Sequence, residues 1–146
     1  MKVISLKLGA IEDVAEIEKA CFAHPWTAAQ IEEYYNNPDA YFFTAIEEDR
    51  VVGYIGTYMV MDECFITNVA VLPDYRGHGI GRALVEKATT NAMNNGASFI
   101  TLEVRTSNST AIKIYEENGF FREGVRPGFY RDPDEDAIIM TRRFKN

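Results

Sequence analysis

The chain has 146 residues, of which 47% are hydrophobic and 25% are charged, and its formal net charge is −7. A chain of this length and composition can bury a core without a disulfide or metal staple, so we predict one domain over residues 1–146. The negative charge argues against nucleic acid as a direct partner, because phosphates would be repelled, and it favours cationic substrates.

The cysteines, histidines and hydropathy exclude further classes of protein. Cys21 and Cys64 stand in apolar contexts and share no metal-ligand spacing with His24 or His78, so we expect neither a disulfide framework nor a metal. No run of about 18 apolar residues is present, as a membrane span requires, and the first residues lack the apolar core of a signal peptide. We expect a cytoplasmic protein with no membrane partner, either a monomer or a weak dimer.

The N-terminal third predicts a strand and two helices. After a strand over residues 3–7, apolar residues recur at helical spacing at Ile11, Val14, Ala15 and Phe22. Thr27 and Gln30 form a capping-box signature for a second helix. Trp26 and Ile31 have the spacing of its hydrophobic staple.

The remaining chain predicts a mixed α/β fold. We expect strands over residues 41–46, 51–61, 65–72, 99–104, 120–125 and 137–144. One helix follows the glycine-rich segment 76–81 and ends at Asn95-Gly96, and a second spans residues 109–117. Strands and helices in this order predict a mixed sheet with helices on both faces.

The glycine-rich segment has the composition of an anion site. Gly77, Gly79 and Gly81 alternate between a predicted strand and a predicted helix, and Arg76 and Arg82 flank them. Backbone N–H groups at a helix start point at a ligand and the helix dipole favours negative charge, so the segment predicts a pyrophosphate site.

Two other interpretations remain open for this segment. It could be a glycine-rich connection without a ligand, although three glycines weaken a helix and need a reason. It could also be a dinucleotide site, with Glu103 as the ribose-binding acid. That fingerprint is G-x-G-x-x-G, however, whereas Arg82 stands in the sixth place here, and the antiparallel strands before the loop do not supply a run of βα units.

Residues 69–84, VAVLPDYRGHGIGRAL, resemble the acetyl-CoA motif of the Gcn5-related N-acetyltransferases (GNAT). Arg76, Gly79 and Gly81 match the core [Q/R]-x-x-G-x-[G/A] of that family. A second element is similar at Asn108, Ala111, Tyr115 and Asn118-Gly119-Phe120. Within the family, the chain resembles the RimI-type ribosomal-protein alanine N-acetyltransferases, through Pro25-Trp26-Thr27, residues 102–105, Ser107-Asn108, Ala111, Tyr115-Glu116, Tyr130, residues 135–137 and Met140.

The resemblance implies a fold and an acetyl-CoA site. The fold is a mixed, mostly antiparallel sheet that is splayed at the cofactor site, with helices on both faces. Val69, Ala70 and Val71 would pair with the pantetheine arm, and the Val71 N–H would face the thioester oxygen. The pyrophosphate would be held by the backbone of Gly77, His78, Gly79, Ile80, Gly81 and Arg82, beside Arg76, with Asn108 across the cleft.

The resemblance also implies catalytic roles for two residues. Glu103 would be the general base, acting through a water, and Tyr115 would be the general acid for the leaving thiolate. Two alternatives remain open: an ion pair of Glu103 with Arg105 or Arg122, and a core position for Tyr115. No covalent intermediate is needed, and both cysteines are expected to be buried apolar residues.

The expected reaction is acetylation of a protein N-terminus. In this subfamily the substrate is the N-terminal peptide of a ribosomal protein that begins with Ala. Trp26 and Tyr130 would border that peptide. The acidic residues at 132 and 134–136 are either a solvated loop or a docking site for a basic peptide. The rival functions are acetylation of a small amine or a lysine side chain, and a non-catalytic acetyl-CoA-binding module.

Overall fold

The computed structural model describes residues 1–144 and contains seven strands, four α-helices and two short 3-10 helices. The strands are β1 Lys2–Ser5, β2 Ala40–Glu47, β3 Arg50–Val60, β4 Glu63–Val71, β5 Phe99–Arg105, β6 Phe121–Tyr130 and β7 Glu135–Arg143. The helices are η1 Leu8–Ala10, α1 Ile11–Cys21, α2 Ala28–Tyr35, η2 Pro73–Tyr75, α3 Ile80–Asn94 and α4 Ser109–Glu117.

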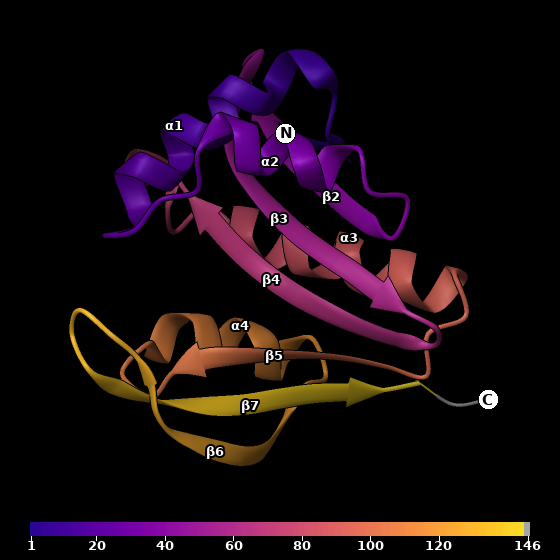
Figure 1. The fold of residues 1–146 in the computed structure, drawn as a ribbon, viewed down its shortest axis with the longest axis vertical. Coiled ribbons are helices and arrows are strands. Elements are labelled where there is room, and N and C mark those ends of the chain that lie inside the picture. The colour runs from indigo at the N-terminus through magenta and orange to yellow at the C-terminus, as the bar shows by residue number, and fades with distance from the viewer. Residues whose placement is uncertain (145–146) are drawn as a thin grey trace.

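All seven strands form one sheet in the order β1-β2-β3-β4-β5-β7-β6. Every neighbouring pair is antiparallel except β4 and β5, which are parallel. That parallel pairing covers only the first residues of β4, from Glu63 to Phe65, opposite Phe99 to Thr101. Beyond it the two strands diverge toward their C-terminal ends, as Figure 1 shows. The expected mixed sheet with a splay is thus confirmed.

Helices cover both faces of the sheet, as expected. On one face α1 and α2 pack over β2, β3 and β4 around a core that includes Val14, Ile17, Ile31 and Tyr54. On the other face α3 and α4 pack over a larger core that includes Leu84, Val85, Ile100 and Met140. In Figure 1, α1 and α2 lie in front of the sheet and α3 behind it. Each large apolar side chain buried in these cores contributes about 1.5–3 kcal/mol.

Helix α2 begins where the capping box predicts. The N–H of Gln30 donates to the Thr27 hydroxyl at 3.2 Å, and the N–H of Thr27 donates to the Gln30 side chain at 2.9 Å. These reciprocal bonds satisfy two backbone donors that a helix start otherwise leaves unpaired. Trp26 packs against the core cluster that includes Ile31, which agrees with the predicted staple.

The last hairpin differs from the sequence prediction. We expected one strand to end at residue 125 and the next to begin at residue 137, but β6 continues to Tyr130 and β7 begins at Glu135. The strand passes Pro127-Gly128 through an irregular register, and the Gly128 N–H donates to the Asp136 carboxylate at 2.8 Å. The Asp136 side chain therefore supplies a hydrogen-bond acceptor where the regular backbone pairing of β6 with β7 is interrupted.

No helix among residues 1–144 is long and apolar enough to cross a membrane. These residues also contain no group of three or more His, Cys, Asp or Glu side chains arranged to hold a metal ion.

Candidate active site

The splay leaves one edge of β4 without a strand partner. The Leu72 N–H donates to the Val52 carbonyl of β3 at 2.8 Å. Backbone groups alternate in direction along a strand, so the N–H groups of Val69 and Val71 point the other way, toward β5. No pairing with β5 reaches this part of β4 within the described chain. An extended ligand can therefore hydrogen-bond to this edge of β4.

The glycine loop leads from β4 to the start of α3. Gly77 and Gly79 have φ of 82° and 80°, which glycine adopts without strain, and a Cβ at either would meet no atom within 4 Å. The first bond in α3 runs from the Ala83 N–H to the Gly79 carbonyl at 3.1 Å. The N–H groups of residues 80–82 therefore have no partner within the helix, as is the case at helix starts that bind anions.

The two arginines that flank the loop have partners within the protein. Arg76 donates to the Val71 carbonyl at 3.0 Å and to the Cys21 sulfur at 3.4 Å, so it fixes the turn after β4. Arg82 donates to Glu117 of α4 at 2.8 Å. This bond lowers the pKa of the Glu117 carboxyl and joins α3 to α4 across the opening.

Glu103 lies on β5 with its side chain partly exposed. The alternating burial of β5 places Leu102 and Val104 in the α3–α4 core and Glu103 on the opposite face, toward α1 and α2. Its carboxylate accepts from Arg126 of β6 at 3.2 Å. Neither of the two ion-pair partners that we considered is correct, because Arg105 pairs with Glu135 and Arg122 with Glu116.

Tyr115 of α4 is 6% exposed, and its ring packs on Phe120. Burial, and secondly the nearby Tyr130, raise the pKa of its phenol above the ordinary value. The hydroxyl accepts or donates no hydrogen bond among residues 1–144, so it can serve a ligand. Burial, followed by the charge of Glu103, raises the pKa of Tyr130 to about 12. Glu103, Tyr115 and Tyr130 therefore share one neighbourhood.

Arg105 organises the hairpin that carries Tyr130. Its guanidinium lies 4.5 Å from the centre of the Tyr130 ring. It donates to the Arg131 and Pro133 carbonyls at 2.9 and 2.8 Å and to the Glu135 carboxylate at 3.2 Å. A planar guanidinium that stacks and donates in this way fixes the orientation of the whole β6–β7 connection.

The acidic run in this connection is engaged within the chain. Glu135 accepts from Arg105, Thr106 and Ser107. Asp136 accepts from the Gly128 N–H, and Asp134 pairs with Arg131 at 3.7 Å. Asp132 lies 2.6 Å from His24, so the β6–β7 connection touches the segment between α1 and α2. Glu135 and Asp136 are thus held by internal contacts, whereas the side chains of Asp132 and Asp134 remain largely exposed, and the docking site stays a prediction.

Comparison with known proteins identifies the family. Residues 11–120 match the model of the acetyltransferase (GNAT) family. The chain belongs to the GNAT family. It is an acyltransferase, and GNAT acetyltransferases use acetyl-CoA as donor.

The relatives of this GNAT chain extend over nearly its full length. The [ribosomal protein bS18]-alanine N-acetyltransferase of Escherichia coli K12 is 34% identical over 146 residues and covers 95% of each chain. A Bacillus subtilis relative is 37% identical and covers 94% of this chain and 92% of its own. The crystal structure of the ribosomal-protein-S18-alanine N-acetyltransferase from E. coli has a TM-score of 0.90 at 31% identity, covering 99% of this chain and 94% of that one. These similarities confirm the predicted RimI-type relationship.

The other predicted site residues have the following surroundings. The Asn108 side chain accepts from the Ala111 N–H at 3.1 Å and so caps α4, and this role was missed in the sequence. Trp26 stacks on Tyr34 with ring centres 4.9 Å apart, so it belongs to the α2 side. His78 is exposed, as expected.

A separate depression of about 410 Å³ lies away from this opening. It is lined by Ser5, Leu6, Tyr34, Tyr35, Ala40, Tyr41, Phe42, Phe43, Asn91 and Asn95. The lining contains no charged side chain, no glycine loop and no residue of β4 or β5. It offers nothing to acetyl transfer, so the splayed edge remains the candidate site.

The contacts of Glu135 predict a pH-dependent contribution to stability. Hydrogen bonds from Ser107 first, and then from Thr106 and Arg105, lower the pKa of Glu135 to about 2. The side chain of a glutamate in an unfolded chain has a pKa of about 4.3. The stabilisation from these hydrogen bonds is therefore complete above that pH and is lost as pH falls toward the folded pKa. We expect Glu135→Gln to be less stable than wild type in urea unfolding at pH 7, with a difference that shrinks between pH 4 and pH 2. Glu33→Gln, on the exposed face of α2, is the matched control and should show no such trend.

Proposed function

We propose that this chain transfers the acetyl group of acetyl-CoA to the N-terminal α-amine of a ribosomal protein whose first residue is Ala. Residues 1–146 act as one N-acetyltransferase domain in this proposal. It is supported by the full-length similarity to the E. coli enzyme named for bS18 alanine acetylation.

The observation that carries the proposal is the unpaired edge of β4 beside the start of α3. An acetyl-CoA molecule has an extended amide-containing arm and a pyrophosphate. The N–H groups of Val69 and Val71 and the C=O group of Val69 suit the amides, and the free N–H groups of residues 80–82 suit the pyrophosphate. The open space beside Gly77 and Gly79 lets phosphate oxygens approach the backbone. Ala70 lies between Val69 and Val71, with its side chain in the α1–α2 core. Asn108 would contact the cofactor from the other side of the cleft.

Acetyl-CoA supplies the acetyl group as a thioester, and the chain positions the reacting groups. The Val71 N–H would face the thioester oxygen and would stabilise the negative charge that develops there. Glu103, through a water, accepts a proton from the attacking amine, while Tyr115 donates its phenolic proton to the departing sulfur. One C–N bond forms and one C–S bond breaks. The proton that leaves Tyr115 is restored from solvent.

A carboxylate base suits an α-amine better than a lysine. An α-amine titrates at about 7.7–8.0 and a lysine at about 10.4, so a larger share of α-amines is already deprotonated at neutral pH. Glu103 then needs to remove a proton only as the C–N bond forms. This difference favours N-terminal over lysine acetylation.

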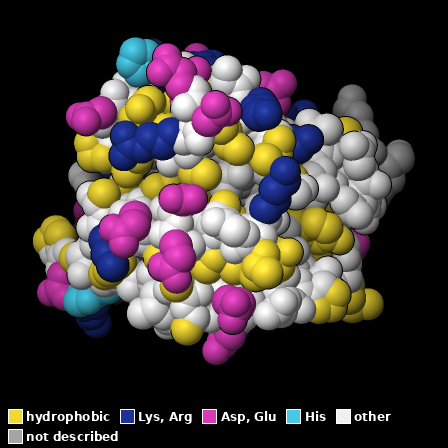
Figure 2. All heavy atoms as spheres, turned by 90° about the horizontal axis from the view of Figure 1, so that it is seen from above, with side chains coloured by type: hydrophobic (Ala, Val, Ile, Leu, Met, Phe, Trp, Pro, Cys, Tyr) yellow, Lys and Arg dark blue, Asp and Glu magenta, His cyan; other side chains and the backbone are white. Residues whose placement is uncertain are grey.

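The two residues proposed to border the peptide come from separate elements. Trp26 belongs to the segment before α2, and Tyr130 ends β6. The net charge of −7 favours approach of a basic ribosomal peptide. Figure 2 looks onto the end of the molecule where α1 and α2 lie and shows acidic and basic side chains interspersed there. The attraction of a basic peptide therefore rests on the overall charge of the protein. Acidic side chains do not gather into one patch on that end.

The test is acetyl transfer to a basic peptide that begins with Ala and contains one internal lysine. We expect the free peptide to react and the same peptide with a blocked N-terminus to remain unmodified, as followed by CoA release and mass spectrometry. Equal reaction of both peptides would make this a lysine acetyltransferase. Polyamines and aminoglycosides serve as the small-amine comparison, and binding of acetyl-CoA without transfer to any amine would indicate a binding module.

A further inference from the structure

Glu18 is a buried carboxylate that none of the roles above uses. It lies on α1 and is 1% exposed. A carboxylate at such a position is costly unless hydrogen bonds compensate for the lost water. Three donors do so: the Trp26 N–H reaches Oε1 at 2.8 Å, the Asn68 side chain reaches Oε2 at 3.1 Å, and the Tyr54 hydroxyl also donates to Oε2.

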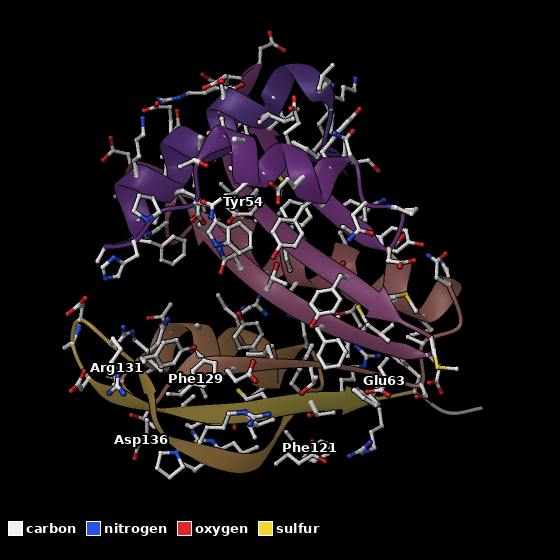
Figure 3. The ribbon with its side chains drawn as sticks, in the orientation of Figure 1. Tyr54, Glu63, Phe121, Phe129, Arg131 and Asp136 are labelled. Carbon is white, nitrogen blue, oxygen red and sulfur yellow. The ribbon has the colours of Figure 1, made fainter. Side chains whose placement is uncertain are left out.

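The three donors come from separate parts of the site. Trp26 lies between α1 and α2, on the side proposed to border the peptide. Asn68 directly precedes the β4 edge at residues 69–71 that is proposed to hold acetyl-CoA. Tyr54 of β3 is fully buried between the α1–α2 layer and the sheet, where Figure 3 labels it. One carboxylate therefore links the peptide side of the opening to its cofactor side.

The same stretch of β4 is irregular, so a contact from outside the sheet can help to fix its position. The register against β3 shifts between Gly56 and Thr57, so that Asn68 pairs with Gly56 but Ile66 pairs with Thr57. Thr67 is the extra residue, and its hydroxyl donates to the Gly56 carbonyl at 3.0 Å. A bulge re-aims the residues that follow it. Asn68 is the first residue after the bulge, and its side chain is held by the hydrogen bond to Glu18.

We propose that Glu18 is a positioning residue that holds the Trp26 segment at a fixed place relative to the cofactor edge of β4. It thereby sets the space available to the first residue of the peptide. This inference rests on the proposed function, because it takes Trp26 to border a peptide and β4 to hold acetyl-CoA. Glu18 acts through Trp26 and Asn68 and does not itself touch the substrates.

Glu18→Gln weakens the link because it replaces a charged acceptor with a neutral amide of nearly the same volume. If its NH₂ group takes the place of Oε1, it faces the Trp26 N–H, and two donors oppose each other. If it takes the place of Oε2, Asn68 must turn its amide so that Oδ1 accepts, and the Tyr54 hydroxyl must accept instead of donate. Glu18→Ala removes both sides at once.

Trp26 reports on the link directly, because it is the only tryptophan in the chain. In Glu18→Ala we expect a red-shifted Trp26 emission and stronger quenching by acrylamide. In both variants we expect the KM for the Ala-initiated peptide to rise about tenfold or more, because bonds to a charged group are lost, with kcat much less affected. The matched control is Glu16→Gln on the same helix, whose side chain is exposed and pairs only with Lys19.

The outcomes separate this inference from the proposed function. Wild-type Trp26 quenching in a folded Glu18→Ala variant, or a lowered melting temperature with an unchanged peptide KM, would show a purely structural role and overturn the inference. If Glu18→Ala does not fold, the peptide KM of Glu18→Gln decides. If wild type acetylates no peptide, the proposed function fails, and the Trp26 fluorescence still decides whether Glu18 positions that segment.

Discussion

Replacing Tyr115 with phenylalanine is expected to lower kcat by about 10²–10⁴-fold, the range that one general acid contributes. The affinity for acetyl-CoA should stay near that of wild type. The ring is buried against Phe120 and remains after the change, so that only the hydroxyl is lost. Burial raises the pKa of this phenol, and low-polarity surroundings also raise the proton affinity of a departing thiolate. The phenol can therefore remain protonated at neutral pH and still donate.

Steady-state kinetics with the Ala-initiated peptide, together with calorimetry of acetyl-CoA binding, measure the two effects. The matched control is Tyr58→Phe, a half-buried tyrosine of β3 that stacks on Phe65 where β4 and β5 are still paired. It should retain wild-type kcat. A wild-type kcat in Tyr115→Phe would return Tyr115 to a core position with no part in the chemistry.

Replacing Gly79 with aspartate is expected to abolish acetyl-CoA binding. The new side chain would occupy the open space beside the loop, and its negative charge would repel the pyrophosphate from the start of α3. Calorimetry on the folded variant should detect no binding at concentrations that saturate wild type. Unchanged affinity would mean that the pyrophosphate site has been misplaced.

The control for this variant lies at the other end of the same helix. Gly96 follows α3, has a φ of 84° and, like Gly79, has no atom within 4 Å of an added Cβ. Gly96→Asp therefore imposes similar backbone strain without touching the loop. The helix dipole favours a negative charge at the start and disfavours it at the end, so Gly79→Asp should be at least as stable as Gly96→Asp. Loss of binding in Gly79→Asp alone then reflects the site and not the fold.

Most of the fold was predictable from local patterns in the sequence. Periodicity and the Thr27–Gln30 capping box predicted α1 and α2, and the glycine punctuation predicted the bounds of α3 and α4 closely. The error lay in β6, where Pro127-Gly128 is a turn signal in the sequence. Its continuation depends on Asp136 of β7, in the same hairpin, and on Arg105 of β5, which contacts the hairpin from elsewhere in the chain. The Arg105 contact is long-range and has no local signature.

The site was predictable in part. The glycine loop, Glu103 and Tyr115 followed from motifs, whereas Glu18 was missed because a glutamate on a helix is ordinarily solvated. Its spacing contained a signal, since residue 18 follows Val14 by four positions and Ile11 by seven, on the apolar face of α1. The Arg126 partner of Glu103 could not be found in this way, because the pairing of β6 with β7 and of β7 with β5 brings it into reach.

The strand order β5-β7-β6 has a consequence for synthesis. β7 follows β6 in the sequence but lies between β5 and β6 in the sheet. Until residues 135–143 have left the ribosome, β5 lacks its antiparallel neighbour and β6 has no neighbour at all. Unpaired strand edges are templates for association with other chains. A nascent chain that stalls before β7 therefore exposes one edge of β5 and an entirely unpaired β6. The addition of β7 alone provides a neighbour for both strands.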